Sequence, residues 1–243
     1  MPLQPHPIQR LACLLLAAAS LSLPLLASAN ESTIRKNLAE RLPNLPAIEE
    51  VRSTPMRGLF EVRVNQSDIL YTDAEGNFLI QGSLIDTRAR SNLTEQRVDQ
   101  LTRLSFKDLP LKDAFTTVRG NGKQKIAVFS DPNCGFCKRL ERDLLNVDNV
   151  TVYTFLVPML GQDSQTKSRN IWCAKDKAAA YNDWMLKGAN PANATCDTAA
   201  LTRNLEFASR QRITGTPTSF TEDGTRIVGA DFNRIQQALA TQK

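Results

Sequence analysis

Residues 126–140 read IAVFSDPNCGFCKRL, an apolar run followed by two cysteines that are separated by two residues. The continuous apolar run at residues 126–129 is typical of a strand that is buried on both faces. Residues 134–145 predict a helix, because their apolar positions recur at helical spacing. A second apolar segment follows at residues 150–155. The stretch therefore predicts a β-α-β unit in a parallel or mixed sheet that is covered on both faces.

The rest of the C-terminal half continues this pattern. Helical spacing covers much of residues 164–187 and returns at residues 201–211 and 232–240. Residues 218–220 and 226–228 flank an Asp-Gly turn and predict a hairpin.

The N-terminal half predicts a small antiparallel sheet. Residues 31–42 read as a short helix that ends before Pro43. Three short alternating segments follow, at residues 59–64, 69–71 and 78–80. The first two of these are expected to expose sheet edges that can pair across a two-fold axis. A connecting helix is predicted over residues 94–104, with Val98, Leu101 and Leu104 on one face.

Composition describes an ordinary globular chain. The 243 residues are 42% hydrophobic and 23% charged, which excludes disordered and fibrous classes. The net charge of +5 comes from lysines and arginines scattered among the acids, a pattern that favours a solvated surface over a nucleic-acid partner.

Residues 1–29 have the pattern of a cleaved export signal. Arg10 is the single charge, residues 11–26 are strongly apolar, and Ala27-Ser28-Ala29 forms a small-x-small cleavage site. The alternative of a transmembrane anchor is disfavoured, because the apolar run is broken by Pro24 and is shorter than the ~20 residues that span a bilayer. We therefore expect an exported protein without stable membrane insertion.

Removal of this segment restricts the chemistry. The one histidine, His6, leaves with it, which excludes imidazole catalysis and imidazole-ligated metals in the mature chain. Four cysteines remain, an even number that in an exported protein indicates disulfides. They are Cys134, Cys137, Cys173 and Cys196.

The C-x-x-C pair is the candidate redox site. Cys134 takes the start of a helix, where free amides and the helix dipole favour a thiolate, and Lys138 and Arg139 add positive charge. Cys137 lies one turn further and faces the core. We expect an exposed Cys134 to attack a substrate disulfide and a buried Cys137 to resolve the mixed disulfide.

Two other interpretations of the pair remain open at this point. Half of a zinc site is disfavoured because Cys173 and Cys196 are not a second close pair, and a purely structural disulfide stays an alternative. Haem attachment is excluded, because Lys138 stands where a histidine is required.

A second signal lies at residues 214–218, TGTPT, just before a predicted strand. Together with the redox helix, it resembles the cis-proline loop of the thioredoxin fold. The resemblance implies that Thr216 and Pro217 lie against the cysteines and offer backbone to a bound peptide.

Three motifs narrow the resemblance from the thioredoxin fold to one family. DPNCGFCK at residues 131–138, GQDS at 161–164 and IWCAKDK at 171–177 are similar to the DsbC/DsbG family of periplasmic disulfide isomerases, on the DsbC side. The likeness extends over essentially the whole mature chain. Two positions depart from related patterns: Phe136 replaces a frequent tyrosine, and Val128 stands where thioredoxin carries a buried aspartate.

The family implies a mixed α+β and α/β architecture. Residues 30–90 would form a cystatin-like antiparallel β dimerisation domain, residues 91–113 a linker helix, and residues 114–243 a thioredoxin-fold catalytic domain with a helical insertion. It also implies a structural disulfide between Cys173 and Cys196 within that insertion.

The resemblance further implies a periplasmic homodimer that reduces and isomerises non-native disulfides in misfolded exported proteins. It implies no cofactor and no metal, with a DsbD-like membrane thiol reductase as electron donor. One alternative is a DsbG-like reductase that protects single thiols from sulfenylation. An alternative of another class is a metal-carrying or chaperone-like binding module.

Overall fold

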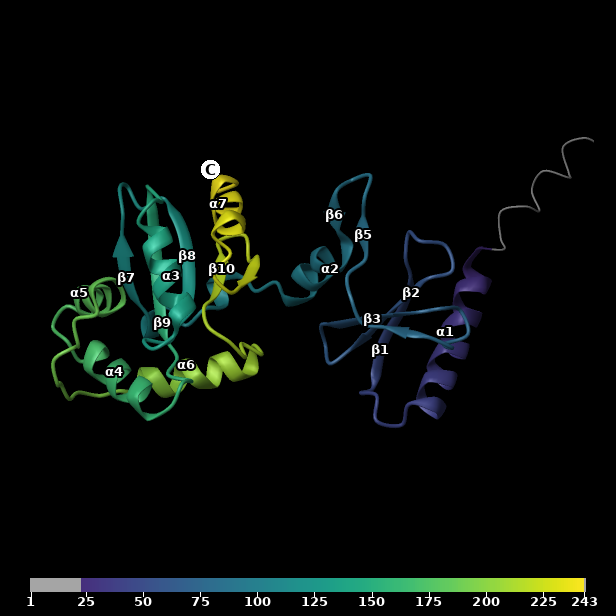
Figure 1. Cartoon of the computed structure of the whole chain (residues 1–243), viewed down its shortest axis with the longest axis horizontal. Coiled ribbons are helices and arrows are strands. Elements are labelled where there is room, and N and C mark those ends of the chain that lie inside the picture. Colours follow the sequence, from purple (N-terminus) through teal and green to yellow (C-terminus); the bar gives the residue numbers. More distant parts are fainter. Residues whose placement is uncertain (1–22, 243) are drawn as a thin grey trace, which may run out of the picture. The chain divides into compact units, whose positions relative to one another are not determined.

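The computed structural model describes residues 23–242, with side chains from residue 30 onward. The chain divides into two compact units, Met1–Leu101 and Thr102–Lys243 (Figure 1). Each unit encloses its own clusters of buried apolar side chains. We refer to them as the N-terminal unit and, because it contains the catalytic domain expected from the sequence, the catalytic unit.

Most of the expected export signal lies outside the described residues. Within residues 23–242, residues 23–29 form the start of helix α1 (Leu23–Arg41). No helix in this described part is long and apolar enough to cross a membrane.

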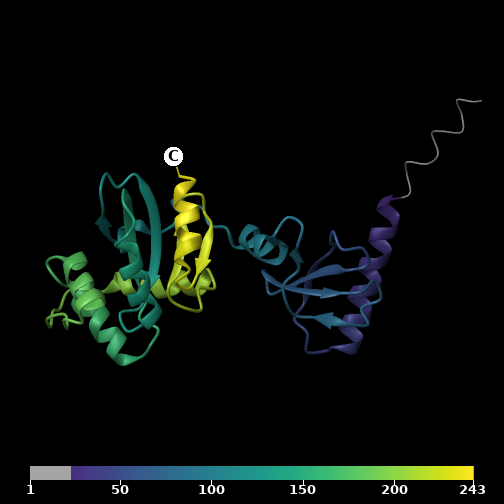
Figure 2. The same cartoon turned by 45° about the horizontal axis from the view of Figure 1, so that its top comes forward.

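The N-terminal unit is an antiparallel sheet with α1 packed on it (Figure 2). Ile34 and Leu38 lie one helical turn apart and are both buried against the sheet. Leu42, four residues after Leu38, is exposed because α1 ends at Arg41. The strands, ordered β1-β2-β3-β4, are β1 (Ile48–Ser53), β2 (Phe60–Val64), β3 (Asp68–Thr72) and β4 (Leu79–Ile80).

The expected sheet edges are wrong. Strands β2 and β3 are central, because β2 pairs with both β1 and β3, and β3 pairs with both β2 and β4. The edges are β1 and β4. Strand β1 escaped the sequence analysis because it carries adjacent acids, Glu49 and Glu50, which form ion pairs with Arg63 on β2.

The connecting helix is shorter and less buried than expected. Helix α2 (Leu93–Thr102) follows a two-residue ladder of β5 (Ile85–Asp86) with β6 (Ser91–Asn92) and buries none of its residues. It is instead held to the sheet by Arg97, which donates to Glu61 at 2.9 Å and to Glu50 at 2.6 Å.

The catalytic unit contains a mixed five-stranded sheet ordered β11-β10-β8-β9-β7. Strands β8 (Gln124–Ser130) and β9 (Val150–Leu156) are parallel and are joined by α3 (Gly135–Leu144), so the predicted β-α-β unit is confirmed. The other strands pair antiparallel. They are β7 (Phe115–Val118), β10 (Thr218–Thr221) and β11 (Arg226–Val228).

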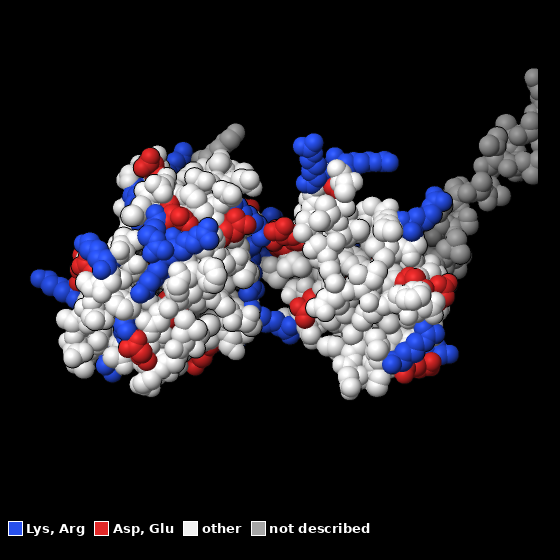
Figure 3. Space-filling view, viewed as in Figure 1, with Lys and Arg blue, Asp and Glu red and all other residues white. Residues whose placement is uncertain are grey.

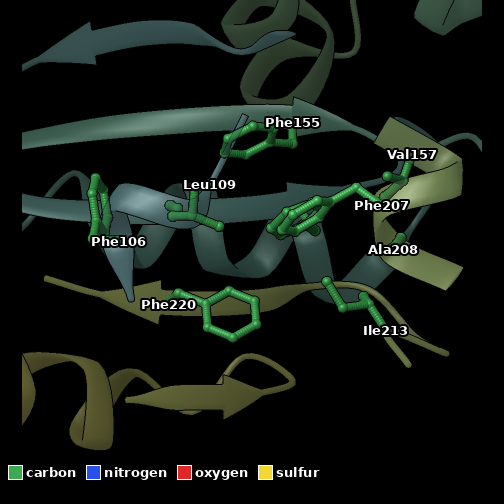
Figure 4. Close-up of a cluster of buried hydrophobic side chains, with 10 residues drawn as sticks. Phe106, Leu109, Phe155, Val157, Phe207, Ala208, Ile213 and Phe220 are labelled. Carbon is green, nitrogen blue, oxygen red and sulfur yellow. The ribbon is translucent and has the colours of Figure 1, made fainter. Parts of the chain in front are cut away.

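Strand β8 is buried on both faces, which explains its unbroken apolar run. Ala127 and Phe129 belong to one cluster, where Phe129 stacks on Phe155 with ring centroids 4.6 Å apart. Figure 4 shows this cluster, which also includes Phe207 and Phe220. Ile126 and Val128 point into the opposite cluster, beneath α3 and the C-terminal helix α7 (Phe232–Ala240). The end of β8 is therefore fixed from both sides.

Helices α4 (Gln162–Trp172), α5 (Lys177–Asn182) and α6 (Ala199–Arg210), with a π-helical turn at Asp183–Lys187, follow β9. A disulfide joins Cys173 at the end of α4 to Cys196 before α6.

The segment before β7 belongs to the catalytic unit. Phe106, in the 3-10 turn Phe106–Asp108, and Leu109 are buried in the cluster around Phe129. A second 3-10 turn, Leu111–Asp113, follows. The expected linker at residues 91–113 is thus divided between the two units.

Both basic and acidic side chains lie on the visible face of each unit, among uncharged residues (Figure 3).

The ion pairs of Arg97 are expected to stabilise the N-terminal unit. Arg97→Ala should lower the free energy of unfolding by about 2 kcal/mol, because it leaves the buried Glu61 without its closest cationic partner. Urea denaturation measures the loss. The matched control is Arg52→Ala, whose more exposed side chain lies 3.9 Å from Glu61 and should contribute less than about 1 kcal/mol. Equal losses would contradict this assignment.

The disulfide between Cys173 and Cys196 is expected to contribute stability. Replacing both residues with serine should cost about 3 kcal/mol on the chain-entropy argument, since the bridge closes a sequence separation of 23. Differential scanning calorimetry measures this loss, and insulin reduction by the variant at a temperature where it is folded tests the effect on chemistry. We expect that rate to stay within about twofold of wild type; a loss of chemistry in the folded variant would contradict a structural role.

Candidate active site

The two cysteines lie where β8 ends and α3 begins. Cys134 is the N-cap residue of α3, and its sulfur accepts a hydrogen bond from the backbone N–H of Cys137 at 3.3 Å. Both cysteines are free thiols in this structure. The strand-loop-helix geometry expected from the sequence thus sets one sulfur at the helix terminus and the other one turn inside.

Hydrogen bonds make Cys134 acidic. The side chain of Cys137 is the main cause that lowers the pKa of Cys134 to about 5, and further hydrogen bonds from the Thr216 side chain and from backbone amides act in the same direction. Burial opposes the shift. At neutral pH the Cys134 sulfur is therefore a thiolate, the reactive form.

Cys137 is shifted in the opposite direction. Burial is the largest cause that raises its pKa, and its hydrogen bond with the Cys134 sulfur adds to the shift. The two sulfurs therefore differ in charge at neutral pH, with the anion on Cys134.

The expectation of an exposed Cys134 is wrong. The residue is only 6% exposed, against 1% for Cys137, because it packs in the apolar cluster that also holds Tyr181 and Met185. Phe136, between the cysteines, is 64% exposed. Phe136 therefore presents an apolar side chain to solvent next to the two cysteines.

The loop before β10 closes over the sulfur. The Thr216–Pro217 peptide bond is cis, and the Cys134 thiol, when protonated, donates to the Thr216 carbonyl oxygen at 3.1 Å. Pro217 is buried, whereas Thr214 and Gly215 are exposed. The structure thus brings the two sequence-predicted signals, residues 131–138 and 214–218, into direct contact.

Asp131 is a site residue for which the sequence predicts no role. Its buried carboxylate accepts from the backbone N–H groups of Asn133, Met159 and Leu160 at 2.7 to 2.9 Å, and from the Ser164 hydroxyl at 2.7 Å. It therefore ties the loop before Cys134 to the start of α4.

A second link joins the same two motifs. The Asn133 side chain donates to Asp163 at 2.7 Å, and Asp163 forms an ion pair with Lys167. Residues 131–138 and 161–164, two of the motifs on which the family resemblance rests, are therefore joined in one hydrogen-bonded cluster.

Trp184 supports the loop from the helical insertion. Its indole N–H donates to the Pro132 carbonyl at 2.6 Å. The ammonium groups of Lys138 and Lys167 lie 4.0 and 4.5 Å from the ring centroid and form cation–π contacts with it. Trp184 therefore holds two positive charges near the loop that carries the cysteines.

Among the described residues, no group of three or more His, Cys, Asp or Glu side chains could hold a metal ion. The geometry is suited to thiol-disulfide exchange at Cys134.

Known proteins share both units. Residues 25–95 match the family model of the disulfide bond isomerase protein N-terminal domain, and residues 111–243 match that of a thioredoxin-like domain. A solved disulfide interchange protein from Neisseria gonorrhoeae superimposes with a TM-score of 0.52 at 36% identity, covering 55% of this chain and 98% of that chain.

Similar curated proteins carry one name. The probable thiol:disulfide interchange protein DsbC of Bordetella pertussis is 43% identical over 197 residues, which cover 81% of this chain and 69% of that protein. The thiol:disulfide interchange protein DsbC of Escherichia coli K12 is 27% identical over 207 residues, with 84% of each chain covered. On this evidence the chain belongs to the DsbC family of thiol:disulfide interchange proteins.

Proposed function

We propose that Cys134 is the nucleophile and Cys137 the resolving cysteine of a periplasmic disulfide isomerase that acts on misfolded exported proteins. The observation that carries the assignment is the opposite shift of the two thiols, with the pKa of Cys134 lowered to about 5 and that of Cys137 raised. Only the first sulfur is a thiolate at neutral pH.

The reaction follows from this asymmetry. The Cys134 thiolate attacks one sulfur of a substrate disulfide, forms a mixed disulfide and releases the other substrate sulfur as a thiolate. A second thiol of the substrate then attacks the mixed disulfide, which regenerates Cys134 and leaves a rearranged substrate. Alternatively, Cys137 attacks Cys134, which reduces the substrate and oxidises the pair.

The oxidised pair needs two electrons to return to the dithiol. A DsbD-like membrane thiol reductase is the proposed donor, through the same exchange chemistry in reverse. This keeps the Cys134 thiolate available for isomerisation.

The backbone at residues 214–216, of which Thr214 and Gly215 are exposed, is the proposed contact for the substrate chain. The Thr216 carbonyl lies against the sulfur and is followed by the cis bond to Pro217, so an extended peptide bound there would bring its disulfide to Cys134. Phe136 would add an apolar contact that does not select a particular sequence.

The N-terminal unit is proposed to form a homodimer through β4. This edge strand is two residues long, and Phe78, Leu79 and Ile80 are exposed there, with Phe78 70% exposed. An apolar sheet edge is suited to pairing with a second copy. Two active sites in one dimer would retain a substrate between successive exchange steps.

The nucleophile can be tested by alkylation. Iodoacetamide should modify Cys134 with a pH midpoint of about 5, while Cys137 stays unmodified, because only Cys134 ionises in this range. Mass spectrometry of tryptic peptides measures each site. Cys137→Ser should accumulate mixed disulfides with substrates, and Cys134→Ser should form none. Equal modification of both thiols would overturn the assignment.

The dimer can be tested separately from the chemistry. Phe78→Asp combined with Ile80→Asp should give a monomer, because the charges prevent burial of the β4 edge. Insulin reduction per active site should remain within about twofold, and recovery of a scrambled multi-disulfide protein should fall severalfold. The matched control, Leu145→Asp, places a charge at an exposed leucine of the catalytic unit. A monomer with full isomerase activity would show that dimerisation is not its source.

A further inference from the structure

Glu141 is a buried acid that the exchange reaction described above does not use. It lies on α3, one turn after Cys137, and is 3% exposed. Within the described part of the chain, no ion pair holds its carboxylate. A carboxyl group in this position is costly to keep charged, so its retention in the core calls for a function or a compensating contact.

A chain of hydrogen bonds leads from this carboxyl to the resolving sulfur. The Tyr181 hydroxyl donates to Glu141 Oε1 at 3.2 Å and lies 2.6 Å from Ser130 Oγ. Ser130 also acts on the resolving thiol, because hydrogen bonding from its side chain lowers the pKa of Cys137 against the larger effect of burial. All four side chains are buried, so bulk water does not take part in the path.

The donors in this chain can all point the same way. In the reduced pair the Cys137 thiol proton points to Cys134. Once Cys134 is joined to a substrate, that proton can point to Ser130 instead, with Ser130 donating to Tyr181 and Tyr181 donating to Glu141. Shifting each proton one place yields a Cys137 thiolate, two neutral hydroxyl groups and a protonated Glu141. The reverse shift restores the starting state, so the chain conducts a proton in either direction.

Cys137 needs such an acceptor. Burial raises its pKa, yet it must become a thiolate to attack the mixed disulfide at Cys134. Residues 30–242 contain no histidine. The nearby carboxylate of Asp131 is already engaged by three backbone N–H groups and the Ser164 hydroxyl.

We propose that Glu141 accepts the Cys137 proton through Ser130 and Tyr181 when Cys137 displaces the substrate from Cys134. This inference rests on the proposed roles of the two cysteines. The Cys137–Cys134 disulfide forms, the Cys134–substrate bond breaks, and the substrate leaves as a thiolate. When a dithiol reductant later opens the pair at Cys134, the Cys137 thiolate recovers its proton from Glu141.

The electrostatic surroundings suit this exchange. Burial raises the pKa of Glu141 to about 7, against the opposing effects of Arg119 and of the Tyr181 hydrogen bond. The charged or titratable groups that bear on the chain are Arg119, Tyr181, Cys137 and, through Cys137, Cys134. A carboxyl that titrates near neutral pH can both take up and release a proton there.

This proton relay, from Cys137 through Ser130 and Tyr181 to Glu141, also affects the choice between reduction and isomerisation. Resolution by Cys137 competes with attack by a substrate thiol on the same mixed disulfide. Slower deprotonation of Cys137 prolongs the mixed disulfide and gives the substrate more time to rearrange. Glu141 therefore sets the lifetime of the intermediate without touching the substrate.

Stopped-flow reaction of the reduced full chain with dithiobis-nitrobenzoate separates the steps. Attack by Cys134 releases the first coloured nitrothiobenzoate thiolate. Displacement by Cys137 releases the second. Neither leaving group needs a proton, so the second phase reports deprotonation of Cys137 and not protonation of the leaving group. In the wild type, the second phase should rise with pH through a midpoint near 7. Glu141→Gln and Tyr181→Phe should slow that phase at pH 8 by at least about tenfold and abolish its midpoint near 7. The first phase should stay within about twofold.

The matched control is Glu206→Gln, which removes an exposed carboxylate from α6 of the same unit and should change neither phase. A second phase that keeps its rate and midpoint in folded Glu141→Gln overturns the relay while leaving the roles of the cysteines intact. Absence of the first phase in the wild type overturns those roles and the relay with them.

Two further measurements do not depend on the kinetics. Glu141 holds its proton more tightly in the folded than in the unfolded state, so its stabilising effect is fully present below the unfolded pKa of ~4.3 and is lost as pH rises through about 7. The melting temperature of Glu141→Gln relative to wild type should therefore increase from pH 5 to pH 8. Carbon NMR of carboxyl-labelled glutamate in the wild type should show one group titrating near 7. Because this measurement uses the wild type, it tests the proposal even if Glu141→Gln does not fold. Absence of that titration overturns the proposal.

Discussion

The sulfur of Cys134 is held at the first turn of α3 by the burial of β8 on both faces. Ala127 and Phe129 lock the strand from one side, and Ile126 and Val128 lock it from the other. A strand packed in this way has no freedom to shift along its axis, because a slip of one residue would exchange its two faces. The loop that follows starts from a fixed point, and the buried Asp131 fixes the loop in turn by binding three backbone amides and a hydroxyl.

Two thiols three residues apart acquire opposite properties from this placement. Burial raises the pKa of both, but only Cys134 receives enough hydrogen bonds to reverse the effect. One of those hydrogen bonds comes from Cys137 itself, so the resolving thiol stabilises the attacking thiolate in the reduced pair before a substrate reacts. Once Cys134 is joined to a substrate, its sulfur carries no negative charge and no longer accepts the Cys137 proton as an anion. Cys137 must then lose its proton to another acceptor before it can attack.

The elements that carry the chemistry were predictable from the sequence, because each has a strong local signature. The unbroken apolar run of β8, the helical spacing of α3 and the proline at residue 217 all describe the structure correctly. Strand β1 was missed because Glu49 and Glu50 mask its pattern, and their ion pairs with Arg63 depend on a partner strand that local sequence does not show. The exposure of Cys134 was misjudged for a similar reason, since the residues that cover it come from α5, the π-helical turn and the loop before β10.

The helical insertion takes part in the site more directly than its position between β9 and β10 indicates. Trp184 holds the Pro132 carbonyl, Ser164 binds Asp131, and Tyr181 lies between Ser130 and Glu141. A thioredoxin places its buried acid on the strand before the cysteines, where this chain has the apolar Val128. With the acid on α3 instead, a hydroxyl from α5 is needed to bridge the carboxyl and the Ser130 hydroxyl. Proton movement at Cys137 thereby depends on the packing of α5, so the insertion that positions the loop also governs how long a mixed disulfide lasts.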